Sequence, residues 1–424
     1  MRSARRPPSR WPGWPWLPRR RCCCPASDEG GPEVSKGPSA FGGGARGGSA
    51  PSHRVLAVSF EIFLACAPGL EPLLLEEVRG KGFRRPRALP GGVAIEGGWP
   101  EVWRANLWVR GAGRVLARLE SFRVVHLAQL DARARKVPWA TVLRRDVPFR
   151  VEAVCAQSRL WHSGAVAQRI ATAIRETVGA PEAAEAPVTV MARIERDLCT
   201  LSLDTSGEPL HKRGWKQAVN PAPLRETMAS LFLLACGYRG TEPVLDPMCG
   251  AGTFVIEAAE IAARLNPGRL RGFAFEHLAS FEAEAWARMR AVESRRDAPA
   301  LCHGSDRDAG AVAMSEANAA RAGVAAGTVF RQAVVSEAAP PSGPPGLVMV
   351  NPPYGTRLGD PGALRPLYQA LGQVLRARFA GWRVGLVTAE PRLAQATGLP
   401  FLPPGPPVPH GGLRVTLWRT GTLG

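Results

Sequence analysis

From about residue 210 to the end of the chain, short apolar segments alternate with long amphipathic ones. The apolar segments predict strands, in EPVLDP, LCHGSDRD, GLVMV and WRVGLVTAE. The segments between them, such as GTFVIEAAEIAARL and ALRPLYQALGQVLRARF, have helical spacing. This alternation is typical of an α/β domain, a parallel sheet wound on both faces by helices. We therefore expect a Rossmann-like, doubly wound domain at residues 208–424, with its ligand site beyond the carboxyl ends of the strands.

Two smaller α+β units are predicted before that domain. In the first, residues 55–122, strands around Phe63 and in GGVAIEG flank a helix over residues 70–78. In the second, residues 123–207, the strand VPFRVEAVCA precedes a helix, and two strands follow it in PVTVMARIERDLCTLSLDTSG. We expect Ser163 to cap that helix and Gly179 to end it.

The formal net charge of +18 favours an acidic partner, of which nucleic acid is the commonest for a basic protein. Arginine-rich composition can also reflect GC-rich coding. Basic residues are numerous in both small units, which favours an RNA-binding surface there. Residues 1–54 are rich in Arg, Pro, Gly and Ser and have too few apolar residues to form a core, so a disordered basic tail is predicted.

The nine cysteines form no C-x-x-C pair and no Cys/His metal spacing. This usage indicates a reducing cytoplasm and no bound metal. No apolar run approaches the roughly 20 residues of a membrane helix, so no membrane partner is expected.

A cofactor loop is predicted in VLDPMCGAGTFVIEAA. Asp246 ends a strand, Gly250 and Gly252 follow, and a helix begins near Thr253. Glycines allow the backbone to approach a ligand, and the helix N-terminus offers free N–H groups. The loop lacks the third glycine of a dinucleotide fingerprint, and its leading acid would repel a pyrophosphate. That acid suits an ammonium group, as in the amino acid end of S-adenosylmethionine; a tight turn with a satisfied aspartate is the alternative.

The next strand ends at Asp306, whose carboxylate can accept two hydrogen bonds from a ribose diol. Asp308 is predicted to cap the following helix. The residues between the loop and this strand, about 266–297, are longer than a minimal unit needs. They predict an inserted helical segment rich in Phe and Trp.

The stretch NPPY follows the strand GLVMV. Asn351 supplies a side-chain carbonyl, while Pro352 and Pro353 form a stiff turn with exposed carbonyls. Two fixed acceptors can take both hydrogens of a planar NH₂ group, which turns its lone pair toward an incoming methyl group. Tyr354 offers a ring on which a base can stack. The alternative is an ordinary N-P-P turn.

Together these segments resemble the bacterial THUMP-containing RNA guanine-N2 methyltransferases, in particular the first half of the large-subunit rRNA enzymes. The resemblance covers about residues 63–417 and rests on these motifs in order: ACAPGLEPLL, GGVAIEG, SRLWHSGAVAQRI, LSLDTSGEPLHKRGWK, APLRETMA, LDPMCGAGTFVIEAA, GSDRD and NPPYGTRLG. It implies a ferredoxin-like unit at 55–122, an RNA-gripping THUMP domain at 123–207 and a methyltransferase domain that uses S-adenosylmethionine.

The same resemblance implies site residues. The amine site would consist of Asn351, Pro352, Pro353 and Tyr354. The cofactor site would comprise Ala222, Pro223, Leu224, Asp246, Met248, Cys249, Gly250, Gly252, Thr253, Asp306 and Asn351. Relatives usually carry an aspartate for the adenine amine where this chain has Val334, so Gln332 or main-chain groups would have to serve.

The NPPY motif also occurs in adenine-N6 DNA methyltransferases and in enzymes that methylate a glutamine amide of release factors. All of these substrates present a planar NH₂ group, so the motif alone does not choose among them. The basic N-terminal module favours structured RNA, with 23S rRNA first and a tRNA guanosine as the alternative. A catalytically inactive RNA-binding protein is a further class, favoured by Val334 and disfavoured by the intact Asn351 and Asp246.

Overall fold

The computed structural model describes residues 59–217, 224–292, 301–354 and 361–424. The described residues fall within one compact unit, Val55–Gly424. The predicted basic tail, residues 1–54, lies outside the described residues, and so do Ala222 and Pro223. The predictions for these residues therefore stay predictions.

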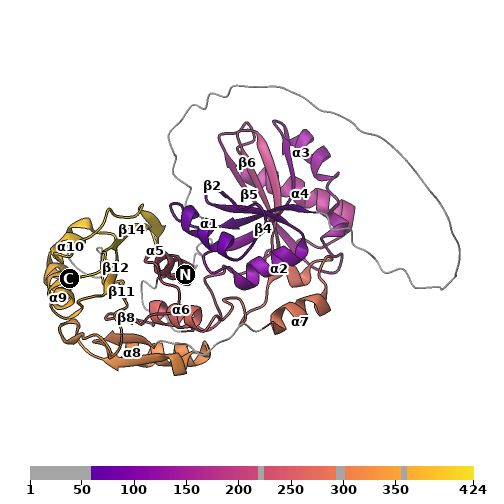
Figure 1. Cartoon of the computed structure of the whole chain (residues 1–424). Coiled ribbons are helices and arrows are strands. Elements are labelled where there is room, and N and C mark those ends of the chain that lie inside the picture. Colours follow the sequence, from indigo (N-terminus) through magenta and orange to yellow (C-terminus); the bar gives the residue numbers. More distant parts are fainter. Residues whose placement is uncertain (1–58, 218–223, 293–300, 355–360) are drawn as a thin grey trace, which may run out of the picture. The chain divides into compact units, whose positions relative to one another are not determined.

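The N-terminal half builds one seven-stranded sheet in the order β2-β3-β1-β4-β7-β6-β5 (Figure 1). Its strands are β1 Phe60–Ala65, β2 Arg87–Leu89, β3 Gly92–Gly97, β4 Arg114–Arg123, β5 Phe149–Ala156, β6 Val188–Glu195 and β7 Leu198–Asp204. Neighbours are antiparallel except β5 and β6, which are parallel. Because β4 pairs with both β1 and β7, the two units predicted at 55–122 and 123–207 share one continuous sheet.

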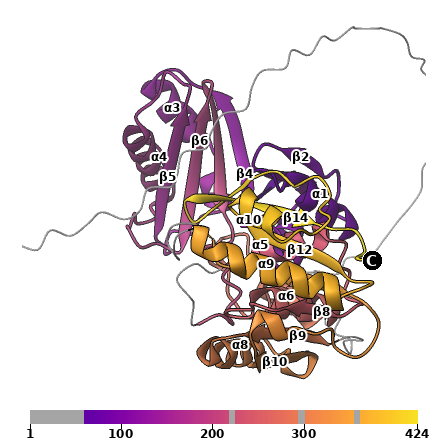
Figure 2. The same ribbon diagram turned by 90° about the vertical axis from the view of Figure 1, so that its left-hand side faces the viewer.

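Helices pack on this sheet through small sets of apolar residues. They are α1 Glu71–Gly80, α2 Trp99–Trp108, α3 Leu127–Ala134 and α4 Ser163–Val178, with a 3₁₀ turn at Trp139–Thr141. Figure 2 shows α3 and α4 lying together beside the strands β5 and β6. On α4 the buried residues recur at helical spacing, as in Val166, Ile170 and Ile174.

The start of α4 differs from the expected one. The cap is His162, whose side chain accepts a hydrogen bond from the Ala165 N–H, and Ser163 is the first helical residue. A ring nitrogen can satisfy a free helical N–H in the same way as a hydroxyl. The predicted end is confirmed, because Gly179 adopts the left-handed conformation with φ 77°.

The C-terminal half builds a second seven-stranded sheet, in the order β10-β9-β8-β11-β12-β14-β13. Its strands are β8 Val244–Asp246, β9 Cys302–Asp306, β10 Thr328–Gln332, β11 Leu347–Val350, β12 Arg383–Thr388, β13 Val408–His410 and β14 Leu413–Arg419. The first five in this order are parallel, which confirms the Rossmann-like prediction. The sheet continues with an antiparallel hairpin, β13–β14, that was not predicted. The sequence signal for this hairpin was the pair Gly411-Gly412, and both glycines take positive φ in its turn.

Helices and short 3₁₀ turns connect these strands. The helices are α5 Glu226–Ala235, α6 Thr253–Ala262, α7 Ala283–Ala291, α8 Ala309–Arg321, α9 Pro361–Arg378 and α10 Pro391–Ala396. The 3₁₀ turns are Ala274–His277, Ala325–Gly327 and Val335–Glu337. All four residues of β11 are buried, as expected for a strand covered on both faces. α6 ends at Ala262, before the end of the segment GTFVIEAAEIAARL for which helical spacing was predicted.

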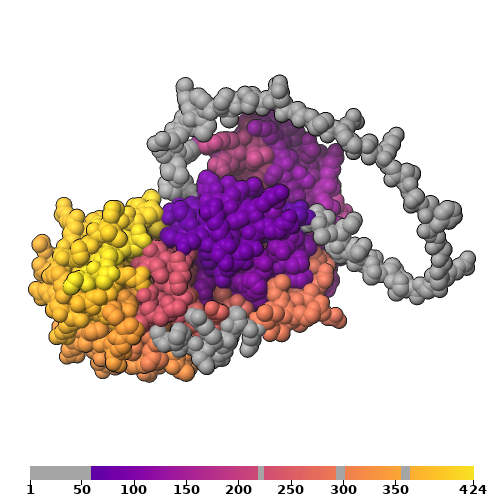
Figure 3. Space-filling model, viewed as in Figure 1, coloured from indigo at the N-terminus to yellow at the C-terminus, as the bar shows by residue number. Residues whose placement is uncertain are grey.

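The inserted segment at 266–297 packs through aromatic rings, as far as it is described. Phe275 contacts Trp286 of α7 edge to face, with ring centroids 5.0 Å apart. Phe275 also lies 6.1 Å from the ring of Trp103, which belongs to α2 of the N-terminal sheet. The insertion therefore joins the two halves of the chain. In Figure 3 the indigo N-terminal surface adjoins the red surface of the residues around α6.

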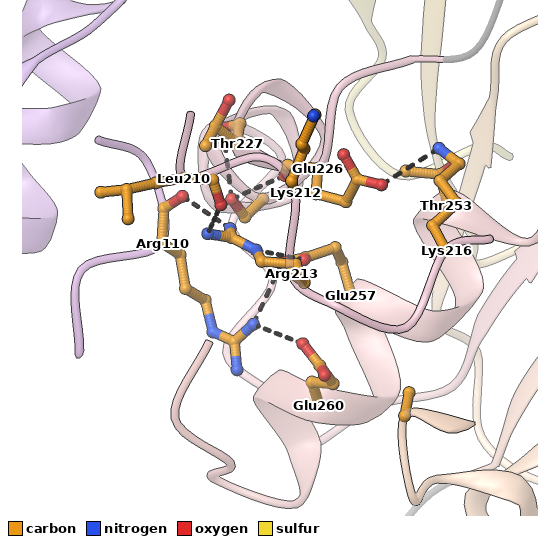
Figure 4. A network of polar contacts seen from close by, with 12 residues as sticks. Arg110, Leu210, Lys212, Arg213, Lys216, Glu226, Thr227, Thr253, Glu257 and Glu260 are labelled. Atoms are coloured by element: carbon orange, nitrogen blue, oxygen red, sulfur yellow. Dashed lines mark hydrogen bonds and ion pairs between the residues drawn. The ribbon is translucent and has the colours of Figure 1, made fainter. Parts of the chain in front are cut away.

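A buried network of charges makes a second connection between the halves (Figure 4). The guanidinium of Arg110, which follows α2, lies 3.1 Å from a carboxylate oxygen of both Glu257 and Glu260. Arg213 donates to Glu257 at 3.1 Å and to the carbonyl of Arg110 at 2.7 Å. Both glutamates are fully buried on one face of α6. The helix that begins at the glycine loop is thus fixed to the N-terminal sheet.

We expect Glu257→Ala to lower the free energy of unfolding by about 3–5 kcal/mol, because it leaves two buried arginines without their shared carboxylate. Urea unfolding of the full chain measures this loss. The matched control is Glu76→Ala, which breaks an ion pair with Arg239 whose two side chains are 54% and 53% exposed. That control should lose about 1 kcal/mol or less. Equal losses in both variants would contradict a structural role for the buried network.

Candidate active site

Three predicted site residues follow neighbouring strands of the second sheet. Asp246 is the last residue of β8, Asp306 is the last of β9, and Asn351 comes directly after β11. The sheet order β9-β8-β11 and the parallel pairing bring these strand ends to one edge. The structure thus gathers the residues at the edge where a doubly wound sheet binds ligands.

The glycine loop is held by hydrogen bonds to its own acids and to β9. Asp246 accepts from the Met248 N–H at 3.0 Å, and the Cys249 N–H donates to the Ser305 carbonyl at 2.9 Å. The Gly250 N–H donates to the Asp306 carboxylate at 3.0 Å. The loop is therefore ordered, with its backbone aligned between the two aspartates.

Gly252 is needed at the start of α6. It takes φ 79°, a conformation that favours glycine, and a Cβ there would lie 3.1 Å from Ser315. Ser315 in turn donates to the Gly250 carbonyl at 2.9 Å. Thr253 is the first residue of the helix, as predicted.

Asp246 is buried without a positive partner. Its side chain is 2% exposed, and no Lys or Arg of the described residues forms an ion pair with it. Burial raises the pKa of Asp246 to about 8; the Met248 N–H acts in the opposite direction, and the charge of Asp306 adds to the rise. A cationic group placed beside this carboxyl would reverse the effect of burial. The site therefore fits a ligand with an ammonium group.

Asn351 holds an unused acceptor. Its Oδ1 atom is buried and, within the described part of the chain, has no hydrogen-bond partner. An unsatisfied buried acceptor costs about 1–3 kcal/mol, so this oxygen is poised to accept from a ligand.

The double proline was expected to present two free carbonyls, and one of them already has a hydrogen-bond partner. The Pro353 carbonyl already accepts a hydrogen bond from the Tyr368 hydroxyl at 3.1 Å. That hydroxyl also lies 3.3 Å from Thr388 on β12. This contact anchors the turn to the sheet and leaves the Pro352 carbonyl as the candidate second acceptor. Sequence reasoning had no signal for Tyr368, which is an ordinary apolar position of α9.

Tyr354 is half-buried at the same edge. Burial raises the pKa of its phenol to about 12, so the hydroxyl stays protonated at neutral pH. The residue can therefore offer a ring face but does not serve as a base.

Lys216 is a site-adjacent residue that sequence analysis missed. Its ammonium donates to the Thr253 hydroxyl at 2.8 Å and to the Leu224 carbonyl at 3.2 Å, and it pairs with Glu226 at 3.2 Å. It thus ties predicted residue Leu224 to the start of α6. The sequence signal for Lys216 was its place at the end of the motif LSLDTSGEPLHKRGWK, next to Trp215, which is fully buried in the structure.

Val334 stands where relatives usually carry an aspartate for the adenine amine of the cofactor, and the structure shows where Val334 and the suggested substitute Gln332 lie. Val334 is 44% exposed and lies just beyond β10. Gln332 pairs with Asp306 in the β9–β10 ladder, but its side-chain nitrogen donates to the Arg307 carbonyl at 3.1 Å. Asp308 caps α8, as predicted, by accepting from the Gly310 N–H.

Across the described residues, no cluster of three or more His, Cys, Asp or Glu residues is arranged to hold a metal ion. None of the helices placed by the structure is both long and apolar enough to span a membrane.

Comparison with protein families matches residues 61–116 to the RlmL ferredoxin-like domain and residues 213–399 to the RMKL-like methyltransferase domain. Among curated proteins, ribosomal RNA large subunit methyltransferase K/L of Syntrophotalea carbinolica is 36% identical over 80% of this chain and 50% of its own. The protein of the same name from Chromohalobacter salexigens is 34% identical over 80% and 49%. The chain spans about half the length of these relatives.

Solved structures resemble nearly the whole described chain. A predicted N6-adenine-specific DNA methylase from Listeria monocytogenes is 30% identical, with a TM-score of 0.78 over 86% of this chain and 97% of that one. SMU.472, a putative methyltransferase complexed with SAH, is 25% identical, with a TM-score of 0.78 over 86% and 99%. The edge geometry, the two family matches and the near-complete Listeria relative agree: this chain belongs to the RMKL-like methyltransferase family and carries its ferredoxin-like domain.

Proposed function

We propose that this protein transfers a methyl group from S-adenosylmethionine to the exocyclic N2 amine of a guanosine in RNA, with 23S rRNA as the substrate. The observation that carries the proposal is the placement of two buried groups at the ends of neighbouring strands: the Oδ1 of Asn351, which has no hydrogen-bond partner among the described residues, and the carboxyl of Asp246. The names of the curated relatives support ribosomal RNA as the substrate class.

The cofactor-binding residues would act through charge and close backbone approach. When bound, S-adenosylmethionine supplies an electrophilic methyl group on a sulfonium. Asp246 would hold the ammonium group, and the Gly250–Gly252 backbone would approach the amino acid end. Asp306, oriented by the Gly250 and Asp308 N–H groups, would accept from the ribose diol. Leu224 and Thr253, joined by Lys216, would border the same end. We infer the same for Met248 and Cys249 and, outside the described residues, Ala222 and Pro223.

The amine site would act by positioning. Asn351 Oδ1 and the Pro352 carbonyl would accept the two amine hydrogens, which draws the nitrogen lone pair out of conjugation with the base. The amine nitrogen held in this way would take the methyl group as the carbon–sulfur bond of the cofactor breaks, and water would take the proton that the nitrogen loses. Tyr354 would stack on the base, and Pro353 keeps the turn in place through Tyr368. A base in a helix would have to be flipped out to reach this edge.

The N-terminal module would bind the RNA. We assign residues 123–207 to a THUMP domain and residues 55–122 to the ferredoxin-like unit, with the methyltransferase domain at 208–424 and a basic tail at 1–54. The described cysteines are free, which supports a reducing cytoplasm as the location. An adenine amine would fit the same acceptors, as the name of the Listeria relative suggests for that protein. Nucleoside mapping of the product separates N2-methylguanosine from N6-methyladenosine.

Asn351→Ala should lower the rate of methyl transfer by at least about 100-fold, the loss seen when one preorganised hydrogen-bond partner is removed. The measurement is transfer of labelled methyl from the cofactor to RNA from cells that lack the protein. RNA affinity should change little, which controls for folding. Turnover close to that of the unaltered protein would refute the amine-site assignment.

Cofactor binding should release a proton near neutral pH. The Asp246 carboxyl, with its pKa raised to about 8, is mostly protonated in the free protein, and an ammonium group would ionise it. Calorimetry in buffers of different ionisation enthalpy should detect the release of up to one proton. Asp246→Asn should abolish the release and weaken binding. Release that persists in that variant would assign the proton to another group.

The same carboxyl should make the free protein less stable as pH rises. Its folded pKa, about 8, is above the ordinary value, so between about pH 4 and pH 8 the folded state keeps a proton that the unfolded chain has lost. The free energy of unfolding should therefore fall by up to about 1.4 kcal/mol per pH unit in this window. Asp246→Asn should remove that part of the slope in urea unfolding. An unchanged slope would contradict the raised pKa.

Charge reversal at Arg144 and Arg145 together should weaken RNA binding and its salt dependence. Each lost phosphate contact lowers the slope of log K against log salt by about 0.7–0.9. The exposed Arg144 forms an ion pair with its sequence neighbour Asp146 at 2.6 Å. The control variant reverses the charge of two exposed arginines of the C-terminal half, Arg392 on α10 and Arg414 on β14. It has the same change in net charge. Equal slopes in the two variants would remove Arg144 and Arg145 from the interface.

A further inference from the structure

The loop that follows β5 carries an exposed tryptophan. Trp161 is 78% exposed, although a side chain of this size is usually largely buried. A single exposed apolar residue needs no explanation, but Trp161 is one of three at the same end of the sheet. Within residues 59–217, the large apolar side chains that are exposed are Val154 near the end of β5, Trp161 in the loop, and Leu198 at the start of β7. All three lie at the end of the sheet where β5 stops and β7 begins.

Hydrogen bonds hold this loop against the β6–β7 turn. The Arg159 N–H donates to Asp197 at 2.8 Å, and the Asp197 N–H donates to the Ser158 hydroxyl at 3.0 Å. The Arg196 guanidinium donates to the Gln157 side chain at 3.2 Å. Gln157, Arg196 and Asp197 all have positive φ, which non-glycine residues adopt only when their surroundings hold them. The loop is thus ordered before any partner binds, so little entropy is lost on binding.

His162 fixes the indole itself. Its Nδ1 atom accepts from the Ala165 N–H at 3.0 Å, which locks the imidazole at the start of α4. The imidazole meets Trp161 edge to face, with centroids 5.7 Å apart and planes at 66°. Gly164 leaves room for this ring, since a Cβ there would lie 3.2 Å from it. The indole is therefore supported at one side while most of its surface stays in solvent.

Arginines occur on the three segments that meet at this end of the sheet, alongside Glu195, which also pairs with Leu198. Arg123 at the end of β4 is paired with Leu198 in the ladder, and Arg159 and Arg196 come from the loop and the turn. Over the described ranges, no carboxylate forms an ion pair with the guanidinium of Arg159. The acid nearest in sequence, Asp197, uses its Oδ1 on the Arg159 backbone. Aromatic surface framed by arginines is the chemistry that binds single-stranded nucleic acid.

We propose that this surface, the Trp161 platform, stacks an unpaired nucleotide of the RNA substrate and holds its neighbouring phosphates. Its members are Val154, Trp161, Leu198, Arg123, Arg159 and Arg196. The nucleotide is unpaired because bases inside an A-form helix are stacked on each other and present no free face. The inference rests on the proposed function in taking RNA as the partner, and it adds a contact on the first sheet, whereas the methyltransferase site is on the second.

The test compares Trp161→Ala and Trp161→Phe in the full chain, with fluorescence anisotropy as the binding readout. The probes are a single-stranded RNA dodecamer and a blunt RNA duplex of the same length. Trp161→Ala should weaken single-strand binding by about 10- to 100-fold, the loss expected for one stacked base. Trp161→Phe should keep most of the affinity, and duplex binding should change little in both. The control Leu413→Ala truncates an exposed apolar residue of β14 and should change neither.

The salt dependence separates stacking from charge. Trp161→Ala should leave the slope of log K against log salt unchanged, while Arg159→Gln should lower it by about 0.7 for the single strand. Calorimetric cofactor binding should be unaltered in both variants.

Three results would overturn the platform. The first is a single-strand affinity that is the same with and without Trp161, in a protein that still methylates RNA. The proposed function would then stand and the platform would not. Another is equal loss on both probes together with a lower melting temperature, which would mean a structural role. The third is binding of poly-glutamate that depends on Trp161 while RNA binding does not, which would assign the surface to an acidic protein. Absence of RNA binding by the unaltered protein would remove the RNA function and the platform together, with cofactor binding still measurable.

Discussion

The carboxylates of Glu257 and Glu260 determine how the two sheets are joined. They lie one turn apart on α6, fully buried, and they hold Arg110 from the N-terminal sheet and Arg213 from the connection between the halves. Buried charges are tolerated only when paired and hydrogen-bonded, so neither half could move away without exposing or orphaning them. Because α6 begins at Thr253, the same helix that anchors the N-terminal half also ends the glycine loop.

The candidate site contains two buried groups that a ligand would complete. Burial raises the pKa of the Asp246 carboxyl, with which no described Lys or Arg forms an ion pair, and Asn351 holds a buried acceptor that no described donor reaches. Each destabilises the free protein, and each would be satisfied by a different part of the reaction: the ammonium group of the cofactor and the amine of the base. Polar groups fixed in advance need no reorganisation when the substrates arrive, which is how a site without a strong base can still catalyse transfer.

The N-terminal sheet would give the reaction its RNA specificity. Planar amines occur in guanine, adenine and glutamine, so the amine acceptors alone do not choose among them. A single sheet runs through the ferredoxin-like unit and the proposed THUMP domain, since β4 pairs with β1 on one side and β7 on the other. The sheet that carries the Trp161 platform is thus joined to α6 through Arg110.

Much of this could be predicted from the sequence because the signals are local. Asp246 and Asn351 each follow an apolar run and Asp306 ends the predicted strand between them in the chain, and parallel strands must bring such residues to one edge. Gly252 shows where a helix begins, and Gly179 where one ends. The motif that includes Trp161 was also visible, but not the exposure of its indole.

Only the tertiary structure decided the rest, because the deciding contacts join residues far apart in the chain. The continuity of the first sheet depends on pairing between β4 and β7, some 80 residues apart. Arg110 meets Glu257 across a separation of 147 residues, and Tyr368 takes the Pro353 carbonyl through the packing of α9. Burial likewise gives Asp246 its pKa, and burial belongs to the folded chain as a whole. The sequence by itself determined which groups could do the chemistry; the fold decided which of them are left without partners.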